Sequence, residues 1–288
     1  MARTVYVNGA FLAEDDAKIS VFDRGFLFAD GVYEVTTVLK GKLVDFEPHM
    51  ARLTRSLNAL QMARPVGEAE LRDIHEKLVA LNELDEGIVY LQVTRGIADR
   101  DFAYPADAAP SLVMFTQARP VVDNPKVEKG IAVMTVPDIR WRRRDIKTVG
   151  LLPASMAKQA ALEAGYGDAW FVEDGLITEG SSNNAFIVNA DGAVITRQLT
   201  SDILHGITRD AILRLAREDN ITIIERPFTP GEAENAKEAF ITSASTFLMP
   251  VVAINHSTIG DGKPGPISRK LRQHYVDAAF ASIGEAVD

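Results

Sequence analysis

The sequence lacks several residues and patterns that whole classes of protein need. None of its 288 residues is cysteine, which excludes a disulfide framework, a thiolate nucleophile and thiolate metal ligands. The five histidines are scattered and form no HExxH-like pair, so we expect no metal site. No long uninterrupted apolar run occurs, so we expect no membrane-spanning segment. The first residues also lack the apolar run of a signal peptide, which favours the cytoplasm.

Negative charge is in excess over the whole chain. The formal net charge is −9 at pH 7, and such an acidic balance argues against nucleic acid as a partner. An anionic ligand would have to be bound by local donors, because the overall field repels it. The composition, with 47% hydrophobic and 25% charged residues, is that of a globular and not a disordered protein.

Local patterns alternate between strands and helices. Runs of β-branched and aromatic residues predict strands at 4–7, 18–22 and 33–39. Apolar residues at helical spacing predict helices that include 50–60 and 207–218. The mixture predicts an α/β or α+β fold.

A proline-containing stretch divides the chain. Residues 119–125 contain two prolines and little periodicity, which is typical of a linker or a surface loop. We therefore expect a small N-terminal domain at 1–118 and a larger C-terminal domain at 126–288. Active sites favour the cleft between such lobes.

A lysine and a carboxylate in suitable local settings indicate a particular chemistry. Lys147 ends an Asp-Ile-Lys run, and Glu179 follows later in what we expect to be a small-residue turn. An amine can form a Schiff base with an aldehyde cofactor, and a carboxylate can pair with a protonated pyridine nitrogen. The two residues therefore suit pyridoxal phosphate (PLP). A single lysine is more often a solvated surface charge, so the hypothesis depends on groups that could hold the phosphate.

Three segments could supply the donors that a phosphate needs. Ile207 and Thr208 open a predicted helix, whose free N–H groups and dipole favour an anion. Arg52, near the start of another helix, could make a bidentate contact. Ser243 and Ala244 lie in a hydroxyl-rich turn that could present backbone N–H groups. Each segment also has an ordinary explanation, as a helix start, an exposed charge or a plain turn.

These segments belong to an ordered series of motifs. The residues FADGVYEV, HMAR, DIK, TEGSSNN and LHGITR occupy 28–35, 49–52, 145–147, 178–184 and 204–209. The series resembles that of the fold-type IV PLP enzymes, from about residue 3 to about residue 285. The resemblance implies a two-domain enzyme with a small N-terminal α/β lobe and a larger, PLP-binding C-terminal lobe. Its Tyr-Glu-Val segment resembles D-amino-acid aminotransferases, whereas branched-chain aminotransferases typically carry an aromatic-Glu-Gly-Ile-Arg segment.

The resemblance implies a role for each matched residue on the cofactor side. Lys147 would hold PLP covalently and move a proton between substrate and cofactor. Glu179 would keep the pyridine nitrogen protonated, and Leu204 would pack against the ring. The phosphate would be held by Arg52, Ile207, Thr208, Ser243 and Ala244.

The chain departs from the family pattern at two positions. The resemblance implies a substrate side formed by Tyr33, Val35, Ser182, Arg100 and Phe102. D-amino-acid aminotransferases have, at the position of Phe102, the His of an Arg-x-His pair that binds the substrate carboxylate. Arg100 occupies the Arg position, although it could also be a solvated loop charge between two aspartates. Ala244 replaces a frequent Thr, which leaves only its backbone N–H for the phosphate.

The resemblance implies a PLP-dependent enzyme of ping-pong mechanism that transaminates D-amino acids with pyruvate or 2-oxoglutarate as acceptor. The resemblance further implies a homodimer with active sites near the subunit interface. The apolar ring of Phe102 predicts weaker dependence on the α-carboxylate and some turnover of (R)-primary amines. Three alternatives remain open: a branched-chain L-amino-acid aminotransferase, an aminodeoxychorismate-lyase-like PLP enzyme, and a non-catalytic phosphate- or nucleotide-binding protein that uses the helix start at Ile207.

Overall fold

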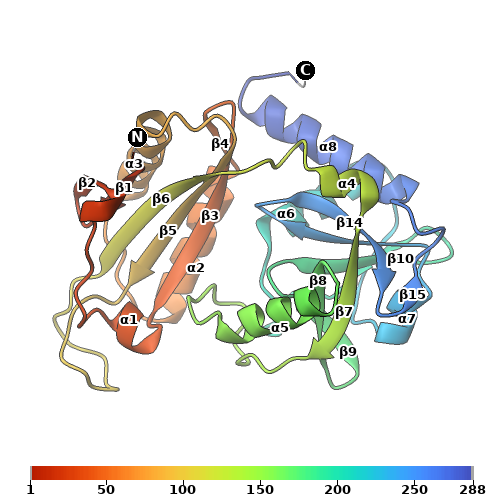
Figure 1. Ribbon diagram of the computed structural model, residues 1–288, viewed down its shortest axis with the longest axis horizontal. Coiled ribbons are helices and arrows are strands. Elements are labelled where there is room, and N and C mark those ends of the chain that lie inside the picture. The colour runs from red at the N-terminus through yellow and green to blue at the C-terminus, as the bar shows by residue number, and fades with distance from the viewer. Residues whose placement is uncertain (1, 287–288) are drawn as a thin grey trace. The chain divides into compact units, whose positions relative to one another are not determined.

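The structure of the chain, a computed structural model that describes residues 2–286, consists of two compact units (Figure 1). Unit 1 comprises the chain up to Pro120 together with Ile146–Gly150, and unit 2 comprises Val121–Asp145 and the chain from Leu151 onward. Both units mix helices and strands, which confirms the predicted mixed α/β class. The limits expected from the sequence stay a prediction, and they did not include the return of the lysine-bearing segment 146–150 to unit 1.

Unit 1 is built on a six-stranded antiparallel sheet with the strand order β2-β1-β6-β5-β3-β4. The central strands β3 and β5 pair over eight positions, from Gly31 opposite Thr94 to Val38 opposite Gly87. The strands are β1 (Thr4–Val7), β2 (Ala10–Ala13), β3 (Gly31–Leu39), β4 (Lys42–Val44), β5 (Gly87–Thr94) and β6 (Ser111–Ala118).

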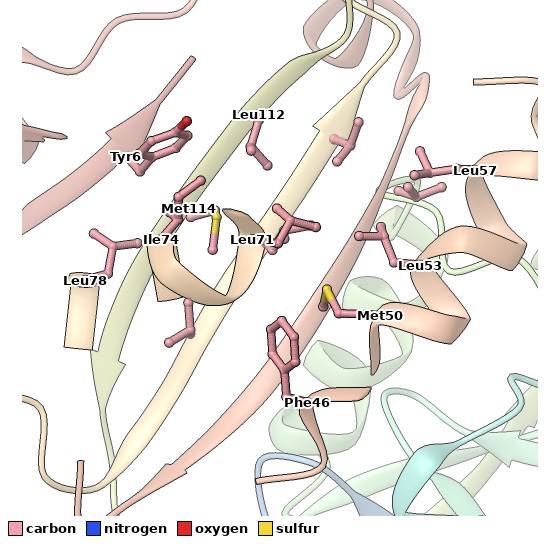
Figure 2. Close-up of a cluster of buried hydrophobic side chains, with 14 of the residues drawn as sticks. Tyr6, Phe46, Met50, Leu53, Leu57, Leu71, Ile74, Leu78, Leu112 and Met114 are labelled. Atoms are coloured by element: carbon pink, nitrogen blue, oxygen red, sulfur yellow. The ribbon is translucent and has the colours of Figure 1, made fainter. Parts of the chain in front are cut away.

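Two long helices of unit 1 bury one face of this sheet. The helical elements are a 3-10 turn (Glu14–Asp16), α1 (Arg24–Phe28), α2 (Phe46–Ala59) and α3 (Glu68–Leu81). Figure 2 shows Met50 and Leu53 of α2 and Leu71 of α3 pointing toward the strands. Val32 and Val38 of β3 contribute to this core. Because successive strand residues alternate between faces, the odd-numbered residues of β3, such as Tyr33 and Val35, lie on the other face.

The strand predicted at 18–22 is wrong. This segment is irregular, and its apolar side chains Ile19, Val21 and Phe22 are exposed. The segment ends at Asp23, whose carboxylate accepts a hydrogen bond from the Gly25 amide and so caps the short helix α1. A side-chain cap of this kind satisfies a helix-end donor, and no neighbouring strand of the described chain pairs with the segment in a ladder.

Unit 2 contains a nine-stranded mixed sheet in which eight strands follow the order β12-β11-β10-β13-β14-β7-β8-β9, and β15 pairs with β14. The pairs β11/β12, β14/β7 and β7/β8 are parallel. The strands are β7 (Ile131–Pro137), β8 (Asp168–Glu173), β9 (Leu176–Gly180), β10 (Asn184–Val188), β11 (Val194–Thr196), β12 (Ile223–Glu225), β13 (Glu238–Ser243), β14 (Phe247–Ile254) and β15 (Ser257–Thr258).

Helices of unit 2 pack against the middle of its sheet. The helices are α4 (Pro125–Lys129), α5 (Leu152–Glu163), α6 (Ile207–Glu218), α7 (Pro230–Glu234) and α8 (Pro266–Ser282). Both α6 and α8 contact β13, α8 also contacts β14, and the two helices contact each other. The stacked rings of Phe186 and Phe240 lie on the adjacent strands β10 and β13. No helix within residues 2–286 is long and apolar enough to cross a membrane.

Candidate active site

Lys147 lies on an extended segment of unit 1 that pairs with the start of β3. The Tyr33 amide donates to the Lys147 carbonyl at 3.0 Å, and the Val149 amide donates to the Gly31 carbonyl at 3.1 Å. Ile146 anchors the segment in the hydrophobic core. The Lys147 ammonium nitrogen is 4.2 Å from the centroid of the Tyr33 ring, a distance at which the ring face attracts a cation.

Arg52 forms a buried ion pair with Glu34, which the sequence did not predict. The guanidinium donates from Nε to Oε1 of Glu34 at 2.8 Å and from Nη2 to Oε2 at 2.7 Å. His49, one helical turn before Arg52 on α2, contacts the same carboxylate through Nδ1 at 2.8 Å. Burial alone would raise the pKa of Glu34, but the charge and hydrogen bonds of Arg52 and His49 lower it well below its ordinary value. Glu34 therefore stays ionised and fixes the orientation of Arg52.

Glu179 is buried in unit 2 and accepts hydrogen bonds from three donors. Its Oε1 accepts from Arg140 Nη1 at 2.7 Å, and its Oε2 accepts from Asn184 Nδ2 and from the Leu204 amide, both at 3.0 Å. The turn predicted around Glu179 is wrong. Glu179 lies within strand β9, and the turn begins after Gly180. Strand β9 pairs with β8, and the Glu179 carboxylate finds its donors inside unit 2.

The charge of Glu179 depends on Arg140, which is itself held by a second carboxylate, Asp138. Burial raises the pKa of Glu179, although Arg140 and the Leu204 amide favour the carboxylate form. Asp138 holds Arg140 by hydrogen bonds from Nε at 3.0 Å and Nη2 at 2.7 Å, and the pKa of Asp138 is lowered because Arg140 outweighs its burial. A cationic ligand next to Glu179 would favour the ionised carboxylate further.

The N-terminus of α6 lies beside the same Asn184. Gly206 precedes the helix, and no side chain caps it. Asn184 Oδ1 occupies the space where a Cβ of residue 206 would lie, so a larger residue there would displace the Asn184 side chain from its contacts with Glu179 and Leu204. Thr242 is opposite Asn184 in the β10–β13 ladder, and its buried hydroxyl has no hydrogen-bond partner among residues 2–286. The N–H groups at Ile207 and Thr208 thus lie near a polar group that lacks a protein partner.

The turn after β13 carries the hydroxyl groups noted in the sequence. Ser243 pairs with Phe247 at the base of the hairpin, and Ser243 Oγ lies 2.8 Å from Thr246 Oγ1 and 3.4 Å from Ser245 Oγ. Ala244 occupies the turn itself. The turn directly follows Thr242, so the predicted phosphate residues of unit 2 gather at the ends of α6 and β13.

Arg100 and Phe102 lie on an exposed loop of unit 1. Phe102 is 79% exposed, and its ring centroid is 5.5 Å from that of Phe28. The Arg100 guanidinium is 5.2 Å from the Phe28 ring and 5.5 Å from the Phe102 ring. Arg24 holds the backbone of the loop, since it donates to the carbonyls of Asp101 at 2.6 Å and Ala103 at 3.3 Å, the neighbours of Phe102 in the chain.

The two remaining predicted substrate residues, Val35 and Ser182, lie on strand β3 and in a turn. Val35 follows Tyr33 by two residues on β3 and therefore shares its face. Ser182 is exposed in the turn between β9 and β10. Within unit 1 the structure brings Lys147 together with Tyr33, and within unit 2 it brings Glu179 together with Leu204 and the start of α6.

Sequence reasoning missed three polar residues of these clusters. Asn184 closes the recognised motif, but nothing in the local pattern indicated that it joins Glu179 to the Leu204 carbonyl. Arg140 lies two residues after Asp138, a spacing that suits a chelated arginine, yet its bond to Glu179 spans 39 residues. Glu34 shares a face with buried Val32, which could have marked it as a buried charge in need of a partner.

A family comparison identifies the class of enzyme to which these clusters belong. The model of the amino-transferase class IV family matches residues 31–254, and the chain belongs to this family. Enzymes of this class use PLP. The predicted resemblance to fold-type IV PLP enzymes is thereby confirmed.

Individual relatives extend over nearly the whole chain. A D-alanine aminotransferase of Bacillus licheniformis is 37% identical over 285 residues, which cover 98% of this chain and 99% of the relative. A D-alanine aminotransferase of Staphylococcus aureus (strain MSSA476) is 36% identical over 274 residues, covering 94% and 96%.

Solved structures show the same fold. A branched-chain amino acid aminotransferase of Escherichia coli superposes with a TM-score of 0.90 at 23% identity, covering 100% of this chain and 97% of that chain. The branched-chain aminotransferase of the thermophilic archaeon Thermoproteus uzoniensis with norvaline gives a TM-score of 0.87 at 24% identity, covering 97% and 95%. These likenesses confirm the two-lobe α/β architecture of the class.

Proposed function

We propose that this protein is a PLP-dependent aminotransferase that converts D-amino acids to 2-oxo acids, with pyruvate or 2-oxoglutarate as amino acceptor. The observation that carries the proposal is its 36–37% identity, over almost its full length, to proteins named D-alanine aminotransferase. The branched-chain enzymes share its fold at 23–24% identity, which supports the architecture and not their substrate.

The surroundings of Glu179 fit the pyridine end of PLP. A carboxylate offers about four lone-pair positions, and Arg140, Asn184 and Leu204 use three of them, so Oε1 can accept one more hydrogen bond. When bound, PLP supplies an electron sink for the negative charge that develops at the substrate Cα. Glu179, kept anionic by Arg140 and a cationic ligand, would hold the pyridine nitrogen in its protonated form.

The ends of α6 and β13 fit the phosphate end. The uncapped helix start at Ile207 and Thr208 supplies N–H donors and the positive end of a helix dipole, and the unpartnered hydroxyl of Thr242 supplies a further donor. The turn at Ser243 and Ala244 would add backbone and hydroxyl donors. We assign Arg52, with its orientation fixed by Glu34, to the phosphate as well. Together these groups would offset the acidic field of the chain.

Lys147 is proposed as the catalytic residue. Its carbonyl accepts a hydrogen bond from the Tyr33 amide, and the nearby Val149 amide donates to the Gly31 carbonyl, so its side chain starts from a rigid position. The amine would bind the cofactor, and after release it would carry the proton from the substrate Cα. Tyr33 and Val35 share one face of β3 and would contact the substrate, together with Ser182.

The loop that carries Arg100 and Phe102 is proposed to contact the substrate carboxylate. Arg100 supplies a cation, whereas Phe102 and Phe28 supply apolar rings close to it. With one polar partner replaced by a ring, we expect weaker dependence on the α-carboxylate and some turnover of (R)-primary amines. Absence of turnover with (R)-1-phenylethylamine, alongside ordinary D-alanine kinetics, would contradict this part of the proposal.

We further propose that the enzyme is a homodimer in the cytoplasm. Several large apolar side chains of unit 1 are exposed on two segments that hydrogen-bond to each other, among them Phe22, Phe26, Ile97, Phe102 and Tyr104. Exposed apolar clusters of this kind favour self-association. Sedimentation of the purified protein as a monomer at micromolar concentration would contradict the dimer.

Replacement of Lys147 tests the proposed function directly. Borohydride reduction of the purified protein with PLP should attach the cofactor to the peptide that contains Lys147, as detected by mass spectrometry. Lys147→Ala should lose this label and the transamination of D-alanine, while the exposed-lysine control Lys126→Ala should retain both. A label at another lysine, or an active Lys147→Ala enzyme, would refute the assignment. Release of pyruvate without amine exchange would favour the lyase alternative.

A further inference from the structure

The hydroxyl turn of unit 2 is followed by a residue in an unusual backbone conformation. Phe247 has φ of 57°, in the left-handed region that glycine adopts readily and other residues seldom do. A glycine would be the ordinary choice at such a position after a short hairpin turn. Phe247 is also fully buried. The chain therefore maintains a strained residue beside the turn, which requires that the surroundings hold it.

Helix α8 holds this residue from two sides. Arg272 donates from Nη1 to the carbonyls of Thr246 at 2.9 Å and Leu248 at 2.7 Å, the residues on either side of Phe247. The ring of Tyr275, three residues later on the same helix face, meets the Phe247 ring edge-on with centroids 4.7 Å apart. The backbone and the side chain of Phe247 are thus both fixed by α8.

The same guanidinium also holds the start of unit 2. Arg272 donates from Nη2 to the carbonyls of Val121 at 2.9 Å and Val122 at 2.7 Å. One planar fork of donors therefore engages four carbonyls, two beside the hydroxyl turn and two where the chain enters unit 2. A lysine has a single point of charge on a flexible stem and cannot reproduce this fork.

We propose that Arg272 is a positioning residue for the cofactor phosphate: it holds Phe247 left-handed, keeps the Ser243–Thr246 turn in its anion-binding orientation, and links that turn to the chain at 121–122. The inference rests on the proposed function, because it takes the turn as part of the PLP site. Arg272 itself need not touch the cofactor. Its contribution is to the phosphate end, since two of its four bonds go to the backbone on either side of Phe247, next to the turn, and the other two tie that backbone to 121–122.

A comparison of two ligands separates this role from a general structural one. Apoenzyme binding should be measured by titration with PLP and with pyridoxal, which lacks the phosphate. In Arg272→Met, we expect about a tenfold weaker affinity for PLP, which corresponds to about 1.4 kcal/mol, and less than about a twofold change for pyridoxal. Arg272→Lys should show a smaller loss in the same direction. Arg269→Met, an exposed arginine on the same helix, is the matched control and should change neither affinity.

Equal losses for PLP and pyridoxal, or an unchanged PLP affinity in Arg272→Met, would overturn the proposal. If wild-type apoenzyme bound no PLP, the proposed function itself would fail. If the wild-type enzyme binds PLP but the variants keep its ratio of PLP affinity to pyridoxal affinity, only the role of Arg272 would be contradicted.

A measurement on the wild-type chain covers the case in which Arg272→Met does not fold. Hydrogen exchange of the apoenzyme should slow in the peptides around 121–122 and 243–248 when PLP is added, and much less when pyridoxal is added. Slowing at 243–248 without any change at 121–122 would contradict the link through Arg272. The same protection by both ligands would show that the phosphate is not what the turn responds to, and would also overturn the proposal.

Discussion

At the scale of single residues, the proposed site contains two buried carboxylates, each paired with an arginine. Glu34 is paired with Arg52, and Glu179 is paired with Arg140. A buried carboxylate without such a partner would take up a proton, because burial disfavours the charged form. Arg52 therefore keeps Glu34 ionised, whereas the pKa of Glu179 stays raised by burial and its charge depends on Arg140 together with a cationic ligand.

Substitution of Arg140 tests this view of Glu179. In Arg140→Met the pKa of Glu179 should rise further, since its largest favourable charge is lost. A hydrogen bond to a charged group contributes about 1.5–3 kcal/mol, so kcat with D-alanine should fall by about 10- to 100-fold. The acidic limb of the pH profile of kcat should move to higher pH.

Arg143→Met is the matched control for this substitution, because Arg143 is exposed and pairs with Asp145 instead. It should leave kcat and the pH profile unchanged. An Arg140→Met enzyme with wild-type kcat across the pH range would contradict the role given to Arg140. Some loss of stability is expected in any case, because one partner of a buried pair is removed.

At the scale of elements, helices α2 and α3 are joined by a buried histidine. His75 Nδ1 donates to the Leu71 carbonyl at 2.7 Å, and the Phe46 ring lies edge-on to it at 5.2 Å. His75 Nε2 has no hydrogen-bond partner in the described part of the chain. Burial lowers the pKa of His75 from 6.5 to about 4, against the effect of the Leu71 bond. The imidazole is therefore neutral in the folded protein at neutral pH.

This histidine predicts a loss of stability in mild acid. Between about pH 6.5 and 4 the unfolded chain binds a proton at residue 75 that the folded chain does not, so the free energy of unfolding falls as pH falls. The difference in pKa corresponds to about 3 kcal/mol once the pH is below both values. His75→Phe should flatten the pH dependence of the urea midpoint across this window. The exposed-histidine control His256→Gln should keep the wild-type pH dependence of the urea midpoint. If His75→Phe showed that same pH dependence, the prediction would be contradicted.

Local patterns predicted elements well where side-chain periodicity decides them. The strand at 33–39 and the helix at 207–218 appear as β3 and α6, because one face of each is buried. The strand at 18–22 failed, since its apolar residues remain exposed and Asp23 caps a helix instead. Strand propensity describes a fit to a half-buried sheet, and a single segment contains no information on whether a partner strand exists.

At the scale of the whole chain, the order of motifs was more informative than any local pattern. It predicts Lys147 and Glu179 as cofactor residues, an assignment that stays a prediction. It could not predict the long-range polar contacts, such as that of Arg140 with Glu179 or of Arg272 with Val121, because these depend on how strands and helices assemble. Nor did it predict that Lys147 belongs to unit 1 while Asp145, two residues earlier, belongs to unit 2.

The central claim is that this class IV aminotransferase acts on D-amino acids. The most direct measurement follows the visible absorption of the lysine-bound cofactor after a single addition of D-alanine or of L-leucine, without an amino acceptor. We predict that D-alanine abolishes this absorption and releases one equivalent of pyruvate per site, while L-leucine leaves it unchanged. Loss of the absorption with L-leucine but not with D-alanine would contradict the account and establish the branched-chain alternative.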